Sequence, residues 1–490
     1  MKRSFLFPLL LLCCYFSISA GPFPNAMIES SLEKFYLDQA EKQLEGLSHP
    51  GHQQFYQTHI WLYRFLATQD SGYADSVRTH WRKTVGAVED LPDDYPLKNV
   101  MLAELHGKRA ALEFLNGKYW AAVLHTRACR NLAQRNQKHF PENNEQYKIL
   151  GLFNIIFGSV PKKYRWLAKI LGYSGNVDMG MEQLEKAAET SVLLKFEAQL
   201  ILFYVEKNLF SEDTRALKRI EVATEKQGPG IVTDFLIACS LEALKKNEAA
   251  IQLLQKRNLY KNDPRVFFIS DWDYHLGRVY YFKEDYKRAK IYFSKFLREH
   301  KGSFYRTDAA FRLGMALSLS GSYDQGRLLF RRVEKEPPAL FNEDEYAAFM
   351  AKQFAKKAPT LSESLLFRAR NLYDGGYYDR AIQRLSQLPV EDSLSAGDRT
   401  EMHYRYGRIK HSQGELTEAI EHYQASLKMA TLHQKWMQAY ACYYMGNIAR
   451  QRKNKVEARV YYQKALAYDD YFYQDGLENR TKTALSSLKK

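Results

Sequence analysis

The sequence predicts an all-α fold in which helical hairpins stack into a right-handed α-solenoid, preceded by an irregular helical module. The chain has 490 residues and 46% of them are apolar, so it is long enough to bury a sizeable core. Only 26 residues are glycine and 14 are proline, which disfavours a turn-rich β fold. A pattern of small and bulky residues also recurs along the carboxyl-terminal half, and this pattern predicts stacked hairpins.

Residues 1–20 have the features of a secretory signal. Two basic residues precede an apolar stretch from Phe5 to Ile18, and small residues follow it. We expect cleavage near Ala20 and export of the mature chain, either to a bacterial periplasm or by secretion from a eukaryotic cell. An uncleaved membrane anchor is the alternative, although the apolar stretch is short for a membrane span.

Three cysteines follow the predicted signal, namely Cys129, Cys239 and Cys442. They are odd in number and far apart, so they predict no disulfide framework. None has the short spacing to other ligands that a structural metal site needs. We therefore expect three small, buried residues inside helices.

The recurring pattern is a small residue, an Ala or Gly twelve positions later, and a bulky residue four positions further. Such spacing places small residues where two antiparallel helices meet, and it places the bulky residue where it fills the space towards the next pair. One hairpin cannot bury its apolar face alone, so several must stack. The six units are Ala238 with Ala250 and Leu254, Gly277 with Ala289 and Phe293, Gly314 with Gly326 and Phe330, Ala369 with Ala381 and Leu385, Gly407 with Ala419 and Tyr423, and Gly446 with Ala458 and Tyr462.

These six units resemble tetratricopeptide repeats, and the last unit, around Gly446 and Ala458, fits the family pattern best. The resemblance implies paired helices that form a concave groove for a protein or peptide partner. The predicted organisation is a signal peptide at 1–20, an irregular helical module at 21–190, repeats at 191–333, an insertion with an extra short helix at 334–360, repeats at 361–470 and a carboxyl-terminal cap at 471–490.

The amino-terminal module contains a degenerate unit at Ala110, Ala122 and Thr126 and a segment, 150–189, that does not fit the repeat. That segment is similar to the tetratricopeptide repeat 39 family and its fungal inclusion-body-clearance relatives. Those relatives work inside the cell, so the export signal departs from them and their cellular roles are not carried over. The residues that carry the similarity are Pro161, Leu171, Gly172, Tyr173, Ser174, Gly175, Gly180 and Leu184.

The sequence contains no motif of an enzyme, a metal site or a cofactor site. Zinc-protease, serine-hydrolase, P-loop and dinucleotide-binding signatures are all missing from it. The one short histidine group, His49, His52 and His59, has no further ligand at metal-site spacing. We therefore predict a protein that is not an enzyme and has no cofactor.

Candidate binding residues lie on the first helix of each hairpin, at positions that line the concave groove in the family. Tyrosines beside arginines suit an extended peptide with acidic or carbonyl groups, because arginine offers a planar fork of donors. The tyrosines fit equally well between neighbouring helices, whereas we expect the arginines to be exposed. The candidate groove residues are Tyr274, Arg278, Tyr281, Arg370, Tyr373, Tyr404, Arg408, Tyr443 and Asn447.

Residues 152–170 suggest an alternative function. Aromatic residues there alternate with cations, and Lys162, Lys163 and Trp166 are typical of a helix that lies on a membrane surface. A core helix interrupted by Pro161 is the other interpretation. The formal charge of +15 is scattered along the chain without a basic cluster, so we expect no nucleic-acid partner. The two functional hypotheses are an exported scaffold that binds a protein or peptide and a peripheral membrane protein.

Overall fold

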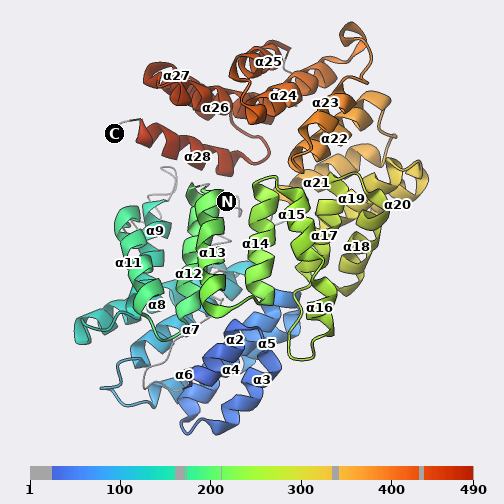
Figure 1. Cartoon of the computed structure of the whole chain (residues 1–490). Coiled ribbons are helices and arrows are strands. Elements are labelled where there is room, and N and C mark those ends of the chain that lie inside the picture. Colours follow the sequence, from blue (N-terminus) through green and yellow to red (C-terminus); the bar gives the residue numbers. More distant parts are fainter. Residues whose placement is uncertain are drawn as a thin grey trace.

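The computed structural model describes residues 25–159, 172, 174–210, 212–333, 342–429 and 435–488. Within these ranges every regular element is a helix, and successive helices pair into hairpins that curl into a solenoid (Figure 1). This confirms the all-α solenoid predicted from composition and periodicity. The predicted signal at 1–20 lies outside the described residues.

The amino-terminal part of the chain consists of helices of unequal length. Its longest hairpin is the degenerate unit of the sequence, where Ala110 and Ala122 are buried between the two helices. The elements are α2 (Ala26–Glu33), α3 (Leu37–Gln43), η2 (Leu44–Gly46), α4 (Pro50–Thr68), α5 (Ser71–Thr79), α6 (Trp81–Glu89), α7 (Lys98–Leu115), α8 (Tyr119–His139), α9 (Gln146–Gly158) and α11 (Val177–Thr190).

The middle of the chain contains the first three predicted units, and each unit forms one hairpin. A π-helical segment, η4, extends α12 and shifts the side chains that follow it. The elements are α12 (Lys195–Tyr204), η4 (Val205–Phe210), α13 (Asp213–Gln227), α14 (Ile231–Ala243), α15 (Asn247–Leu254), α16 (Arg257–Asn262), α17 (Asp271–Phe282), α18 (Tyr286–Glu299), α19 (Arg306–Ser318) and α20 (Tyr323–Val333).

The remaining three units follow, and the first of them begins at a capping box. The Thr360 hydroxyl accepts a hydrogen bond from the Glu363 backbone N–H, and the Glu363 carboxylate accepts one from Thr360. The elements are α21 (Asn342–Phe354), α22 (Leu361–Asp374), α23 (Tyr378–Leu385), η5 (Glu391–Ser393), α24 (Ala396–Gln413), α25 (Leu416–Met429), α26 (Lys435–Gln451), α27 (Lys455–Ala467) and α28 (Gln474–Ser487).

As predicted, small residues form the contact between the two helices of each hairpin. The packing of the bulky residue differs from the prediction. A Cβ atom added to Gly446 would come within 2.6 Å of the Tyr462 ring, and one added to Gly277 within 2.5 Å of the Phe293 ring. The aromatic ring therefore covers the glycine of its own hairpin instead of filling only the space towards the next pair. Gly314 with Phe330 and Gly407 with Tyr423 repeat the arrangement.

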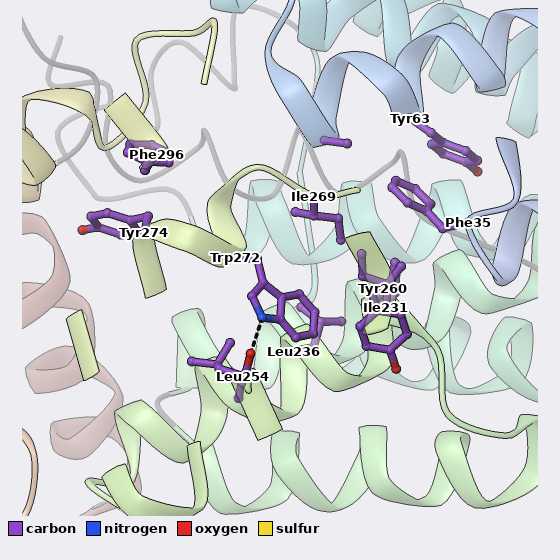
Figure 2. Close-up of a cluster of buried hydrophobic side chains, with 14 of the residues drawn as sticks. Phe35, Tyr63, Ile231, Leu236, Leu254, Tyr260, Ile269, Trp272, Tyr274 and Phe296 are labelled. Carbon is purple, nitrogen blue, oxygen red and sulfur yellow. Dashed lines mark hydrogen bonds between the residues drawn. The ribbon is translucent and has the colours of Figure 1, made fainter. Parts of the chain in front are cut away.

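Long-range contacts hold the turns of the solenoid together. The backbone N–H of Ser270 donates to the carbonyl of Ala67 at 2.9 Å, which joins the amino-terminal helices to the repeats. Near this junction Trp272 is fully buried, and its indole N–H donates to the Leu254 carbonyl at 2.8 Å (Figure 2). At the other end α28 turns back from α26 and α27 and contacts η4 (Figure 1).

The predicted insertion contains a helix of three turns, α21. It packs against α19 and α20 and buries Ala347, Ala351 and Phe354 in the main core. The insertion is thus an integral layer of the solenoid and does not merely cap a loop.

Candidate functional site

The concave side of the solenoid contains a cavity of about 650 Å³. Its wall is formed by α12, η4, α14, α17, α19, α22 and α24, and α28 closes it from the carboxyl-terminal end. Nearly half of the residues in this wall are charged. The cations are Lys207, Lys245, Arg278, Arg312, Arg370, Arg408 and Arg480, and the acids are Asp213, Glu242, Asp271, Glu343 and Asp374.

Helical geometry explains why three of the predicted arginines face one cavity. Arg278, Arg370 and Arg408 each follow the small residue that faces the second helix of the hairpin. Successive residues of a helix are rotated by about 100° around its axis. The arginine that follows the small residue therefore points away from the contact between the two helices and towards the concave side. Stacking of the hairpins then brings the arginines together.

Arg408 lies among tyrosines and has no carboxylate within ion-pair distance in the described part of the chain. Its guanidinium donates to the hydroxyl of Tyr373 at 2.7 Å and to that of Tyr404 at 3.2 Å. Its central carbon lies 3.9 Å from the centroid of the Tyr444 ring. Aromatic rings and hydroxyls hold this cation in place without neutralising it.

Arg370 and Arg480 are also weakly neutralised. Arg370 donates to the Tyr346 hydroxyl at 2.8 Å, and its closest carboxylate, that of Asp374, is 3.8 Å away. Arg480, on α28, makes neither an ion pair nor a hydrogen bond with the residues that the structure describes. Together with Arg408 they bring more positive charge to the cavity than their direct carboxylate partners balance.

The other two arginines of the wall have acidic partners. Arg312 pairs with Asp308 one turn before it, and Arg278 Nε lies 3.5 Å from Glu242 Oε2. Their charge is partly balanced within the protein, so they contribute less to the attraction of an anion.

Burial changes the ionisation of the acids in the wall. It raises the pKa of Asp271 to about 7 and also raises the pKa of Glu343, so these groups carry a reduced negative charge near neutral pH. Burial acts in the same direction on Glu242, but His275 and Arg278 outweigh it and lower the pKa of that carboxyl. The cavity is therefore cationic at neutral pH.

The predicted tyrosines form a layer behind the arginines. Tyr274, Tyr281, Tyr373 and Tyr404 are buried, and none of them belongs to the cavity wall. Tyr274, for example, donates to the Asp308 carboxylate at 2.7 Å. These tyrosines pack between neighbouring helices, which is one of the two locations that the sequence allowed for them.

The arginines are less exposed than expected. The side chains of Arg278 and Arg370 retain 24% and 18% of their accessible surface, because neighbouring turns of the solenoid enclose them.

Two further predicted groove residues lie away from the cavity. Tyr443 packs against the ring of Tyr462, and the Asn447 side chain accepts a hydrogen bond from the Tyr462 hydroxyl at 2.7 Å. They stabilise the last hairpin and do not join the arginines.

The sequence analysis missed several residues of the wall. Arg312 lies two positions before the small residue Gly314. The only sequence feature that points to Arg312 is Asp308, one turn earlier on the helix. Glu343 belongs to the insertion and Arg480 to the cap, both outside the repeating pattern. Their place in the cavity depends on the closure of the solenoid.

The alternative membrane segment is only partly described. Lys162, Lys163 and Trp166 lie outside the described residues. The preceding helix, α9, buries Leu152, Ile155 and Ile156 in a core shared with α11 and α12. Those apolar side chains are therefore not available to a membrane. Among the described helices, none combines the length and the hydropathy that a bilayer span requires.

Comparison with known families identifies the repeats. The tetratricopeptide repeat family matches residues 274–299, within α17 and α18, and residues 368–432, from α22 through α25. The chain contains tetratricopeptide repeats. Both matches coincide with units predicted from the spacing of small and bulky residues. The similarity to the tetratricopeptide repeat 39 family stays a prediction.

Solved structures of another helical-repeat protein resemble the chain over most of its length. A monomeric mutant of IFIT1 with m7Gppp-AAAA has 15% identity and a TM-score of 0.30, and the match covers 94% of this chain and 97% of that one. The human IFIT1 dimer with PPP-AAAA has 16% identity and a TM-score of 0.29, and the match covers 81% and 100%. Likeness at this level says nothing about what this chain binds.

Proposed function

We propose that this protein is an exported, non-catalytic scaffold that binds an extended acidic segment of a partner protein in its concave cavity. The observation that carries the proposal is the incomplete neutralisation of Arg370, Arg408 and Arg480, which line one cavity. Cations held in a partly enclosed space gain strongly from an added carboxylate, because a charge-assisted hydrogen bond is about twice as strong as a neutral one.

The fold supports a protein partner. Proteins with tetratricopeptide repeats typically bind other proteins. In this chain the arginines are held by Tyr346, Tyr373 and Tyr404, so they are ordered before a partner arrives. Preorganisation of this kind reduces the entropy that the receptor loses on binding.

The size of the cavity favours a short stretch of chain over a folded domain. Its volume of about 650 Å³ lies within the range of roughly 300–1,000 Å³ typical of pockets for small ligands. A few acidic side chains of an extended segment fit such a space, with the rest of the partner outside it.

Fluorescence anisotropy tests the proposal with a labelled hexaglutamate peptide and an uncharged hexaglutamine peptide. We expect the wild-type chain to bind hexaglutamate and not hexaglutamine. Arg408→Gln with Arg480→Gln should weaken hexaglutamate binding at least tenfold. Arg459→Gln removes an exposed arginine of α27, far from the wall, and should leave binding unchanged.

Two outcomes would overturn the proposal. The first is equal binding of both peptides, and the second is equal loss of affinity in Arg459→Gln and in the cavity variant. A single-stranded RNA oligonucleotide of the same net charge is a further probe. Preference for this RNA over hexaglutamate would replace the protein segment by a nucleic acid as the ligand.

Export has a separate test. The full chain is expressed in a bacterial host, and its intact mass is measured in the periplasmic fraction. We expect a mass that lacks residues 1–20, because the predicted cleavage lies near Ala20. A full-length chain found only in the cytoplasmic fraction would contradict export and leave the cavity proposal intact.

A further inference from the structure

A cysteine, a histidine and a glutamate form a cluster in the wall of the same cavity. Cys239 and Glu242 lie one turn apart on α14, and His275 faces them from α17. The Cys239 sulfur is 3.6 Å from His275 Nε2 and 3.8 Å from Nδ1. On its other side His275 Nδ1 lies 2.5 Å from Glu242 Oε1.

Cys239 differs from the other two cysteines. Cys129 and Cys442 are buried, with 4% and 2% of their surface exposed, whereas Cys239 is half-buried and faces the cavity. The expectation that all three are buried core residues is therefore wrong for Cys239.

Two basic groups lie close to Cys239. The Lys207 ammonium lies 3.4 Å from the backbone carbonyl of Cys239 itself. Burial lowers the pKa of His275, but Cys239 and Glu242 outweigh it and raise that pKa to about 10, which keeps the imidazole protonated at neutral pH. Reactive cysteines occur in electropositive, partly exposed surroundings, since nearby cations favour the nucleophilic thiolate.

The cluster also contains buried atoms that have spare bonding capacity. Glu242 Oε2 and Arg278 Nε lie 3.5 Å apart, and neither has a hydrogen-bond partner in the described part of the chain. The Glu242 side chain is only 4% exposed. Buried polar atoms without partners are rare in folded proteins, and a ligand that enters the cavity offers them partners.

We propose that Cys239 is a modification site that undergoes thiol–disulfide exchange with small disulfides carrying carboxylates. The thiolate sulfur attacks one sulfur of the incoming disulfide, a new S–S bond to Cys239 forms, and the original S–S bond breaks. The departing thiolate takes a proton from the His275 imidazolium, or leaves as the anion. The incoming disulfide is the only oxidant. The cavity cations attract its carboxylates, so acidic disulfides should react fastest.

The reaction is tested on the intact chain with two aromatic disulfides. Dithiobis(nitrobenzoate) carries two carboxylates, and dithiodipyridine carries none. Mass spectrometry of proteolytic fragments identifies which cysteine is modified. We expect the first equivalent of dithiobis(nitrobenzoate) on Cys239, at least tenfold faster than on Cys129 or Cys442. Cys239→Ser should abolish this fast phase, and Cys442→Ser should retain it.

Exposure alone would also make Cys239 react first, so the second readout is the pH profile. A thiol with an ordinary pKa of about 8.5 reacts roughly 75-fold faster at pH 8 than at pH 6, because its thiolate fraction rises by that factor. We expect a smaller rise at Cys239 in the wild-type chain, because the His275 ring lies 3.6 Å from the sulfur. This measurement uses the wild-type chain, so it does not depend on the folding of a variant.

His275→Gln removes the imidazolium and keeps a polar side chain. We expect it to slow the reaction of Cys239 at pH 6 at least tenfold and to restore a steep pH profile. Three results would overturn the proposal: a wild-type profile as steep as that of an ordinary thiol, equal rates for all three cysteines, or faster relative reaction with dithiodipyridine than with dithiobis(nitrobenzoate). None of these results depends on whether hexaglutamate binds, so the two proposals fail separately.

Discussion

Two groups of enclosed charges in this molecule differ in how they are paired. One buried cluster joins α7, α9 and α12, where Glu104, Lys108, Lys148 and Glu197 bring together two cations and two carboxylates at N–O distances from 2.6 to 3.2 Å. In the cavity the cations outnumber the acids, and Arg408 is held only by tyrosines. In the first group the cations and the carboxylates are equal in number, whereas the cavity has an excess of cations.

The comparison shows that pairing, more than burial, separates structural charges from charges available to a ligand. A buried ion that loses its partner costs several kcal/mol, so a balanced cluster resists change. An arginine that interacts only with tyrosines has no such partner to lose, and its charge is free to act on a ligand.

Lys108→Met should destabilise the protein by about 3–5 kcal/mol, because it leaves the two buried glutamates with a single cation. Urea unfolding monitored by circular dichroism measures the change. Lys138→Met, at an exposed position of α8, is the control and should change stability by less than about 0.5 kcal/mol. Adding Glu197→Gln to Lys108→Met restores the charge balance and should recover part of the loss. A loss below about 1 kcal/mol in Lys108→Met would contradict the assignment of this cluster as structural.

Gly446→Leu should destabilise the last hairpin by about 1–3 kcal/mol, because even its Cβ atom would lie 2.6 Å from the Tyr462 ring. Gly86→Leu in α6 is the matched control, since nothing lies within 4 Å of a Cβ atom at that position. Equal melting temperatures for Gly446→Leu and the wild type would show that the helices do not meet at this seam.

Asp271→Asn should remove part of the pH dependence of stability. The pKa of Asp271 is raised from 3.8 to about 7 in the folded chain, so between pH 4 and 7 the folded state keeps a proton that the unfolded state has released. Stability therefore falls as pH rises through this window. Between pH 5 and 8 the wild type should lose about 2–3 kcal/mol more than Asp271→Asn. Ionisation also adds a negative charge to the wall, so hexaglutamate binding should weaken from pH 6 to 8 in the wild type and less in the variant. Superimposable pH profiles of the two proteins would contradict the shift.

Most of the fold could be predicted from the sequence, because the contacts inside a hairpin depend on local spacing. Gly446, Ala458 and Tyr462 are separated by twelve and four residues, and that spacing alone places them together. The direction of Arg278, Arg370 and Arg408 also follows from their place beside the small anchors. Their position on one cavity is therefore a consequence of helical periodicity.

The rest of the site could not be predicted, because it depends on how the solenoid closes. Arg480 joins the wall only because α28 turns back onto η4, and Glu343 joins it through the insertion helix α21. Neither segment follows the repeat, so no spacing signals its contacts. The proximity of Cys239 and His275 was not predicted either, since His275 reaches the cysteine from the next hairpin.

Binding and stability measured together on Arg408→Gln with Arg480→Gln decide whether these arginines serve a ligand. We expect at least a tenfold loss of hexaglutamate affinity and a change in unfolding free energy below about 1 kcal/mol. A variant that keeps its affinity but unfolds several kcal/mol more easily would show that these arginines are structural.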